Sequence, residues 1–484
     1  MIIRLAAALL VPILAVFTGL ALLWPTAPAA RASVLLKLML AVPLGLGLSS
    51  VGFFLWLVAV GPGVTMLSAV EVAVLLTLAV LLVRRRHVIS GSPALALDVL
   101  PVGQARLLPV ALALLLILAL ASFGALSVAS PHGWWDAISI WNLRARFIFR
   151  GGEYWTDGLT PLLIWTHPDY PLLLPGVVAR AWKLIGSEST AVPIVIAFLF
   201  TFCTVGTLAS GVSRLRGRAQ GVLAGVALLG SAPLIWHGAT QYADIPLGLF
   251  ILATLTLLAL HEQLAAPGAH RFLVLAGVSA GLAAWTKNEG LVFVITLLLA
   301  YTAVVARAAG WQASARRGAA ILLGLLPVIL VVVGFKLTLA PPNDIIAAMA
   351  SSSTLARLAD PARYGVVLGA LLERFVFFGS AWLGMPVMLT VYAALVGVRR
   401  RPLGAIAVNT SALTLALLLA VYTAAFLTTP YGIEWHVYTA LDRLLLHLWP
   451  ATLLCFFLAV RAPGELQDEE SPAEEGQGSE TAVA

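Results

Sequence analysis

The chain has 484 residues, of which 61% are hydrophobic and only 11% are charged, and its mean hydropathy is +0.99. Soluble domains are roughly 45–50% apolar and about 25% charged, so a soluble enzyme, a disordered protein and a fibrous protein are excluded. The net charge of +7 comes from a basic body, because the last 20 residues carry seven acidic residues and no Lys or Arg. Many of the basic residues are Arg in short clusters between apolar runs, so nucleic acid is not an expected partner.

Thirteen apolar runs are long enough to cross a membrane as helices, at about 20 residues for each span. They lie at residues 4–24, 38–60, 63–83, 107–128, 190–212, 219–236, 245–260, 271–286, 290–306, 318–339, 375–397, 403–427 and 444–461. We therefore predict an all-α polytopic transmembrane helical bundle. It divides into N-terminal helices over 1–106, a core over 107–463 and a disordered acidic tail over 464–484.

Four basic clusters fall on one side of the membrane under this span count, and the positive-inside rule makes that side cytoplasmic. The clusters are Arg84–Arg86, Arg214–Arg218, Arg316–Arg317 and Arg399–Arg401. The acidic tail is then cytoplasmic in a plasma (inner) membrane, and the polar segments 129–189, 237–244, 340–374 and 428–443 lie outside. The first run could instead be a cleaved signal peptide, because Arg4 precedes its apolar stretch and small residues follow it. Its length of about 20 residues favours a span.

The outer segment 129–189 is far longer than the 2–8 residues typical between packed helices, which is typical of a functional loop. It begins with the motif Pro-His-Gly-Trp-Trp-Asp-Ala, whose acidic residue is Asp136, and Arg144 and Arg146 follow eight and ten residues later. A carboxylate there could act as a base beside an anionic lipid headgroup. The alternative is an interfacial belt of Trp with a solvated Asp. Arg residues on the outer side oppose the orientation signal of the rest of the chain and favour the functional interpretation.

A second motif in the same segment, Trp-Thr-His-Pro-Asp-Tyr-Pro, contains His167, Asp169 and Tyr170. Its two prolines hold the backbone extended and keep these side chains off a helix, so we predict that they line a substrate. The alternative is a stiff turn that leads into the next helix, with a structural His.

Two further motifs place charged residues at the outer ends of apolar runs. Asp244, in Gln-Tyr-Ala-Asp-Ile-Pro, lies close to hydrocarbon depth, where a carboxylate is costly unless it is paired or functional. It could also cap a helix, and both interpretations can hold together. Lys287 and Glu289, in Trp-Thr-Lys-Asn-Glu-Gly, could pair only with each other. Alternatively, Lys287 neutralises a phosphate or pairs with an acidic site residue.

The last outer segment carries His436, Asp442 and Arg443 ahead of the final span. The simplest interpretation is that they converge with the first outer loop on one outer cavity. The alternative, weighed equally, is that Asp442 and Arg443 extend to the membrane interface while Trp435 and Tyr438 anchor it.

Glu71 is the only acidic residue in the early apolar runs, and it could pair with a basic residue such as Lys37 or Lys336. Cys203 and Cys455 lie in apolar runs without metal-type spacing, and we expect both to be packing residues. The sequence contains no Walker A loop, GxSxG, HExxH or dinucleotide motif, so ATP-driven transport and common hydrolase chemistry lack support.

The order of the motifs resembles that of the GT-C glycosyltransferases, in the branch that contains the protein O-mannosyltransferases and the lipid A aminoarabinose transferase. After the first-loop acid come His-Pro-x-Tyr-Pro-Leu-Leu, Tyr-x-Asp-Ile-Pro-Leu and Ala-Gly-x-x-x-Gly-Leu-Ala-x-x-Thr-Lys, all within residues 134–291. Two features depart from the family. Three spans precede the helix that leads into Asp136, and Ala137 stands where mannosyltransferases often have Glu.

The resemblance implies a membrane enzyme that moves a sugar from a polyprenyl-phosphate donor to a glycan, lipid or protein acceptor at the outer face, with inversion. It implies that Asp136 and Asp244 are catalytic and that basic residues hold the phosphate. The candidate substrate-binding residues are Arg144, Arg146, His167, Asp169, Tyr170, Lys287, Glu289, His436 and Arg443. No cofactor is implied, and a divalent metal stays an open alternative. The competing function is a multi-pass transporter or a lipid or oligosaccharide flippase, which charges deep within several spans would favour.

Overall fold

The computed structural model describes residues 1–24, 34–85, 104–263, 268–343, 353–378, 384–399 and 404–462. Within these ranges the secondary structure is helical, and the only β-type pairing is an isolated bridge between Val398 and Val460. The predicted all-α class is therefore confirmed for the described part of the chain. The predicted tail over 464–484 and the small residues of the alternative signal peptide lie outside the described residues.

Ten helices in the described ranges are long and apolar enough to cross a bilayer. They are α1 (Ile2–Leu23), α2 (Val34–Ala59), α3 (Thr65–Arg85), α4 (Gln104–Ala129), α7 (Ala191–Arg216), α10 (Asp244–Gln263), α12 (Asn288–Ala309), α13 (Trp311–Thr338), α18 (Ala405–Thr428) and α19 (Ile433–Ala459). Each coincides with one of the predicted apolar runs. The chain is thus a multi-pass membrane protein by the length and composition of its helices.

The other three predicted runs form shorter or interrupted helices. Run 219–236 becomes α8 (Arg218–Leu229) and α9 (Ala232–Ala239), which are bent by 64° at a break where Pro233 begins the second helix. Run 271–286 is α11 (His270–Thr286), with 17 residues. Run 375–397 covers the end of α16 (Pro361–Phe377) and α17 (Met385–Val396). The described helices therefore supply ten spans, or 11 with the bent pair, and a count of thirteen stays a prediction.

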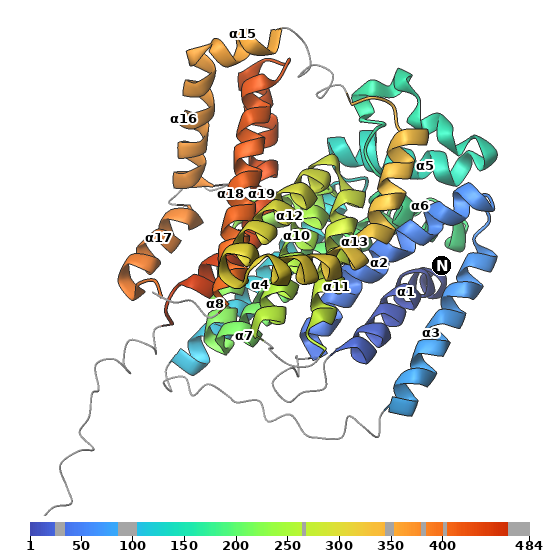
Figure 1. Ribbon diagram of the computed structural model, residues 1–484. Helices are drawn as coiled ribbons and strands as arrows, with labels where there is room; N and C mark the ends of the chain where they lie inside the picture. The colour runs from blue at the N-terminus through green and yellow to red at the C-terminus, as the bar shows by residue number, and fades with distance from the viewer. Residues whose placement is uncertain are drawn as a thin grey trace, which may run out of the picture.

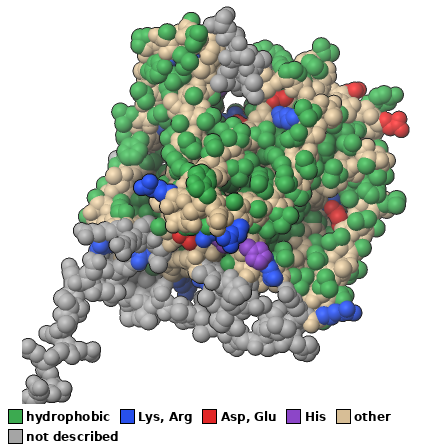
Figure 2. Space-filling view, viewed as in Figure 1, with side chains coloured by type: hydrophobic (Ala, Val, Ile, Leu, Met, Phe, Trp, Pro, Cys, Tyr) green, Lys and Arg blue, Asp and Glu red, His purple; other side chains and the backbone are tan. Residues whose placement is uncertain are grey.

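Helix α10 forms the centre of the bundle. Its sequence is apolar on all sides, and 94% of its 18-residue apolar stretch is buried inside the protein. It packs against α7, α11, α18 and α19 (Figure 1). By contrast, only 6% of the 18-residue apolar stretch of α3 and 11% of that of α4 are buried inside the protein. Figure 2 shows the apolar side chains that cover much of the visible surface, as expected of a protein surrounded by lipid.

Helices α11 and α13 approach each other closely at two glycines. A Cβ at Gly277 would lie 2.0 Å from the carbonyl oxygen of Ile321, and a Cβ at Gly324 would lie 1.8 Å from that of Val274. Small residues at such crossings let helix backbones pack tightly inside membranes. This contact holds the middle of α11 against the middle of α13.

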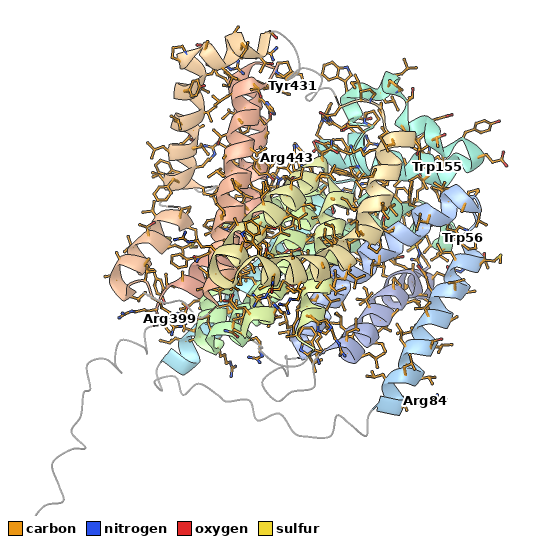
Figure 3. The ribbon with its side chains drawn as sticks, in the orientation of Figure 1. Trp56, Arg84, Trp155, Arg399, Tyr431 and Arg443 are labelled. Atoms are coloured by element: carbon orange, nitrogen blue, oxygen red, sulfur yellow. The ribbon has the colours of Figure 1, made fainter. Side chains whose placement is uncertain are left out.

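The connections gather at two ends of the bundle, which we call the loop end and the basic end. The loop end carries the short helices η3 (Ala137–Trp141), α5 (Asn142–Arg150), η4 (Gly152–Leu159), η5 (Pro161–Thr166), α6 (Leu173–Ile185) and α15 (Ser353–Ala359). Trp155 and Tyr431 lie at this end, whereas Arg84 and Arg399 lie at the opposite, basic end (Figure 3). Arg216 also belongs to the basic end, because it donates at 2.8 Å to the carbonyl of Val460.

Two expectations about connections need correction. The segment 428–443 was expected to be an outer loop, but α19 begins at Ile433, so His436, Asp442 and Arg443 are helical. The helix extends this far because no Pro or Gly follows Gly432 until Pro450, and Glu434 suits its first turn. The segment 340–374 likewise contains α15 and most of α16.

Glu71 pairs with a basic residue, but this residue is neither Lys37 nor Lys336, which the sequence offered as examples. Its carboxylate accepts from the guanidinium of Arg180 and from the hydroxyl of Ser49 at 3.0 Å. Lys37 instead lies 5.3 Å from the centroid of the Trp24 ring. The reason is tertiary: α6 packs against α1 and α2, and this packing brings Arg180 to α3.

Candidate functional site

The loop after α4 is fastened to the turn that precedes α10. The amide of Trp134 donates at 3.2 Å to the carbonyl of Thr240. Gly133 permits this approach, because its φ is +77° and a Cβ there would lie 2.7 Å from the Thr240 oxygen. The contact holds Asp136, three residues further on, beside the N-terminal end of α10.

Arg443 joins Asp136 to Asp244. Its Nη2 pairs with Asp136 Oδ2, and its Nε lies 2.9 Å from Asp244 Oδ2. The guanidinium also lies over the ring of Tyr242, 4.8 Å from the centroid. Arg443 comes from α19, far from the other residues in sequence (Figure 3). The structure thus brings together residues of the first loop, the start of α10 and the last outer segment.

Asp244 is fully buried and has two further partners. Lys287 Nζ lies 2.9 Å and His447 Nε2 lies 2.7 Å from its Oδ1. Burial of a carboxylate is costly unless opposite charges and hydrogen bonds compensate it, and these partners do so. Asp244 therefore acts as an electrostatic anchor between α10, the α11–α12 junction and α19. A substrate hydroxyl would have to displace one of these partners to reach it.

Lys287 pairs with Glu289 and also with an acidic residue of the site, so the alternative in which Lys287 and Glu289 pair only with each other is wrong. It lies in extended backbone between α11 and α12, with φ −150° and ψ 163°. Besides Asp244, its Nζ lies 3.0 Å from Glu289 Oε1. Burial lowers the pKa of Lys287, but the charges of Asp244 and Glu289 outweigh burial and hold the pKa above its ordinary value. Lys287 is therefore a permanent cation in the interior of the protein.

These contacts define what we call the Asp244 cluster. Its members are Asp136, Asp244, Lys287, Glu289, Arg443 and His447. Three carboxylates face one Lys and one Arg, so the cluster is close to neutral and carries no positive excess. An incoming phosphate would therefore have to compete with a carboxylate for a cation.

A second cluster surrounds Asp169, which is 3% exposed. Its Oδ2 accepts from Asn288 at 2.6 Å and from Asn343 at 2.9 Å, and Lys336 Nζ lies at 3.4 Å. Lys336 also donates at 2.6 Å to Asn288 Oδ1. These bonds tie the segment 129–189 to α12, α13 and the residues just after α13, so Asp169 has a clear structural role.

An aromatic stack connects the two clusters. Tyr170 lies between Trp141 and His167, with ring centroids 5.6 and 4.9 Å away and interplanar angles of 14° and 13°. Lys287 Nζ lies 5.9 Å from the centroid of the Tyr170 ring. His167 ends η5 in left-handed backbone, with φ 48°. The amide of Tyr170 donates at 3.0 Å to the carbonyl of His167, so the backbone forms the turn of the alternative interpretation and is not extended as the prolines predicted. The turn sets the Tyr170 ring beside the Asp244 cluster.

A small cavity lies behind the cluster, between α7 and the turn before α10. Its volume is about 20 Å³, enough for about one water, and Tyr242, Gln241 and Asn142 line it. Burial and the charge of Asp136 raise the pKa of Tyr242 to about 12, so its hydroxyl stays neutral at physiological pH.

The two Arg predicted to hold a phosphate have other partners. Arg144 is 1% exposed and donates to the carbonyl of Thr166. Burial lowers the pKa of Arg144 to about 10, an effect that the charge of Asp169 partly offsets. Arg146 lies 3.4 Å from Glu188 and over the ring of Trp182. In these contacts Arg144 supports the loop, and Arg146 packs between α5 and α6 rather than at the Asp244 cluster.

His436 and Asp442 are also engaged away from the cluster. His436 Nδ1 lies 2.8 Å from Thr429 Oγ1, and seven residues of helix, about 10 Å, separate it from Arg443. Asp442 lies 2.6 Å from Arg374 Nε. The sequence offered two equal alternatives for these residues, convergence on one cavity or extension to the membrane interface. Arg443 joins the Asp244 cluster, whereas Asp442 pairs with Arg374 of α16.

Sequence reasoning missed several members of the two clusters. His447 lies one helical turn after Arg443, a spacing that puts both on one face of α19 and could have revealed it. Asn288 lies inside the recognised Lys-Asn-Glu motif. Lys336 was considered only as a partner for Glu71, and nothing in the sequence marks Asn343.

The described residues contain no group of three or more His, Cys, Asp or Glu side chains arranged to hold a metal ion. Comparisons with protein-family models, with curated proteins and with solved structures found no match for this chain.

Proposed function

We propose that the chain is a membrane glycosyltransferase of the GT-C type, which moves a sugar from a polyprenyl-phosphate donor to an acceptor outside the cytoplasm. The observation that carries the proposal is the position of Arg443, which pairs with Asp136 of the first loop and with Asp244 at the start of α10. A charged cluster at the end of a bundle is what a donor with a lipid tail and a phosphate headgroup requires. The apolar surface below it suits the tail.

Arg443 offers a way to couple donor binding to catalysis. A phosphate that binds the guanidinium would compete with Asp136 for the same Nη2 donor. Once released, the Asp136 carboxylate loses its neutralising partner and becomes a better base. Asp244 keeps Arg443 in place during this exchange, because it holds the Nε atom.

The proposed reaction is an inverting displacement at the anomeric carbon. Asp136 accepts the proton of the acceptor hydroxyl, and the acceptor oxygen forms a bond to that carbon. The bond from the carbon to the phosphate oxygen breaks, and its electron pair leaves with the polyprenyl phosphate. Arg443 and Lys287 stabilise the negative charge that develops on the leaving phosphate.

The Asp169 cluster and the aromatic stack position the machinery in this proposal. Lys336 and Asn288 hold the loop that carries Tyr170, whose ring faces Lys287. Trp141 and His167 cover the two faces of the Tyr170 ring, so Tyr170 positions Lys287 in this proposal and does not hold the sugar. The order of the sequence motifs supports the proposed family.

The orientation is part of the proposal: the loop end faces outward from a plasma (inner) membrane, and the basic end and the tail face the cytoplasm. The basic residues at one end of the bundle support it. The acceptor is a glycan, a lipid or a protein at the outer face.

One observation favours the competing function of transport or lipid flipping. The pair of Glu71 and Arg180 joins α3 to α6 inside the helical bundle, and charges within membrane helices often mark translocation paths. The decisive experiment incubates the full-length protein in lipid nanodiscs with a panel of polyprenyl-phosphate sugars and measures release of free polyprenyl phosphate. Release with at least one donor supports the transferase. Movement of labelled lipid across liposomes, without release from any donor, supports the flippase.

A further inference from the structure

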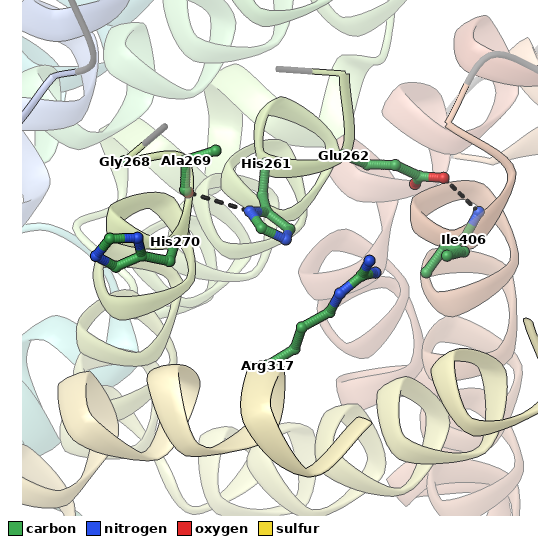
Figure 4. Close-up of a pocket in the computed structure, with 7 residues that line it drawn as sticks. All are labelled: His261, Glu262, Gly268, Ala269, His270, Arg317 and Ile406. Atoms are coloured by element: carbon green, nitrogen blue, oxygen red, sulfur yellow. Dashed lines mark hydrogen bonds between the residues drawn. The ribbon is translucent and has the colours of Figure 1, made fainter. Parts of the chain in front are cut away.

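A cavity of about 280 Å³ lies at the basic end of the bundle, between α10, α11, α13 and α18. Figure 4 shows His261, Glu262, His270, Arg317 and Ile406 around it, and the Arg317 guanidinium points into the space between His261 and Glu262. Two imidazoles and one guanidinium from three different helices thus line one hollow. Its volume is slightly below the usual range of ligand pockets, so it suits a small group.

The acidic residue in the wall is engaged elsewhere. The carboxylate of Glu262 accepts from the amides of Ile406 at 3.0 Å and Ala407 at 2.5 Å, at the beginning of α18. The positive end of that helix compensates its charge. His261 Nδ1 lies 3.1 Å from the carbonyl of Ala269 and donates to it. The opposite ring nitrogen, Nε2, is then an acceptor in the neutral ring and donates to an anion only when the ring is protonated, which a bound anion favours.

The cavity is separate from the Asp244 cluster. Asp244 is the first residue of α10 and His261 lies 17 residues later, about 26 Å along the helix axis. A ligand in this cavity would therefore not contact the residues of the proposed glycosyl transfer. An inference about the cavity does not depend on that proposal.

We infer that this cavity binds a phosphate group, supplied either by the headgroup of an anionic phospholipid or by a small soluble phosphate. Guanidinium and imidazolium groups recognise phosphate oxygens through charge-assisted hydrogen bonds. Basic pockets between membrane helices on the cytoplasmic side bind lipid headgroups in other proteins. Arg317 supplies the permanent charge, and His261 supplies a directional contact, whereas the exposed ring of His270 points away from Arg317 at the edge of the cavity (Figure 4).

The test uses the delipidated full-length protein in detergent and measures thermal unfolding during titration. The probes are dioleoylphosphatidylglycerol, dioleoylphosphatidylcholine and inorganic phosphate. The variant Arg317→Gln removes the charge that points into the cavity. The matched control is Arg316→Gln, which removes the same charge from the exposed neighbouring residue of α13.

We expect phosphatidylglycerol or inorganic phosphate to stabilise the wild type and the Arg316→Gln variant, with at least about tenfold weaker affinity for Arg317→Gln. Stabilisation by the lipid alone identifies a headgroup as the source, and stabilisation by inorganic phosphate identifies a soluble phosphate.

A second variant, Ile406→Trp, fills the cavity without a change of charge and should also abolish the response, so the test holds even if Arg317→Gln does not fold. Equal responses in Ile406→Trp and the wild type, or no response to either phosphate probe, would overturn the inference. Stabilisation by phosphatidylcholine to the same extent as by phosphatidylglycerol would also overturn the inference.

Discussion

The ammonium group of Lys287 lies 2.9 Å from a carboxylate oxygen of Asp244, and the two side chains are only 3% and 0% exposed. The pair connects the start of α10 to the α11–α12 junction across 43 residues of sequence. A buried ion pair adds little net stability, because desolvation offsets the attraction between the charges. Removal of one partner is far more costly, since it leaves the other charge buried without compensation.

The variant Asp244→Asn should therefore reduce the free energy of unfolding by about 3–5 kcal/mol. Lys287, Arg443 and His447 would all lose the negative charge of their common partner and one of its two acceptor oxygens. Thermal unfolding of the full-length protein in detergent measures the effect. The double variant Asp244→Asn with Lys287→Met should recover part of the loss, because it also removes a stranded charge. A single variant as stable as the wild type would show that the pair has no structural role.

A second prediction concerns alkaline pH and Tyr242. The pKa of Tyr242 is raised from 10.0 to about 12 in the folded protein, chiefly by burial and then by the charge of Asp136. Above pH 10 the unfolded chain loses this proton while the folded protein keeps it, so stability falls as the pH rises from about 10 to 12.

The variant Tyr242→Phe lacks this titration and should lose about 1 kcal/mol less than the wild type between pH 9 and pH 11. Melting curves at both pH values measure the difference, and Tyr154→Phe, at an exposed tyrosine, serves as the control. Parallel losses in Tyr242→Phe and the wild type would contradict the prediction.

The helical class and most spans could be predicted from the sequence, because twenty consecutive apolar residues have few other solutions in a membrane. The break between α8 and α9 was less evident, since Gly230 and Pro233 interrupt a run whose composition stays apolar. The start of α19 was placed too late because charged residues in its first turns resemble a loop. In the structure those charges have partners on α10 and α16.

The residues of the candidate site could also be predicted from the sequence only in part. Charged residues at the ends of apolar runs are conspicuous, so Asp136, Asp244, Lys287 and Arg443 could be selected from the sequence. Which of them pair could not be fixed, because the pairs join segments from 43 residues apart, for Asp244 with Lys287, to 307 residues apart, for Asp136 with Arg443. Arg144 was equally conspicuous, yet its burial under the loop follows only from tertiary packing.

The orientation of the bundle can be tested with reporter fusions. Because the Arg clusters gather at one end, fusions after Arg86 and Arg218 should report a cytoplasmic location, and one near Gly152 should report an external location. Alkaline phosphatase and green fluorescent protein fusions give opposite signals and serve as mutual controls. A cytoplasmic reading at Gly152 would remove the topology on which the proposed function depends.

Donor binding should depend on Arg443 more than on Arg146. Arg443 lies between two carboxylates with a side chain 22% exposed, whereas Arg146 is held by Glu188. Arg443→Lys keeps the charge but cannot make two directed contacts, so donor affinity should fall at least about tenfold. Arg146→Lys is the matched control and should change affinity little.

Equilibrium binding of a fluorescent polyprenyl-phosphate sugar measures both variants. If the affinity is unchanged after Arg144, Arg146, Lys287 and Arg443 are all replaced by Gln, the phosphate does not bind these cations.

The most direct test of the proposed chemistry is Asp136→Asn. Asp136 is largely buried and is the first carboxylate after α4. In the proposal the donor phosphate binds Arg443, which is the partner of Asp136. Asn preserves the shape of the side chain but cannot accept the acceptor proton. Turnover should therefore fall by about 10²- to 10⁴-fold while the protein still folds and binds the donor. Single-turnover release of polyprenyl phosphate measures the rate, and the donor-binding assay verifies an intact site.

Asp169→Asn is the control for a structural carboxylate and should lower stability more than the chemical rate. Near-normal turnover by Asp136→Asn would move the base to Asp244, Asp169 or Glu289 and would show that the resemblance to the family fails at this position.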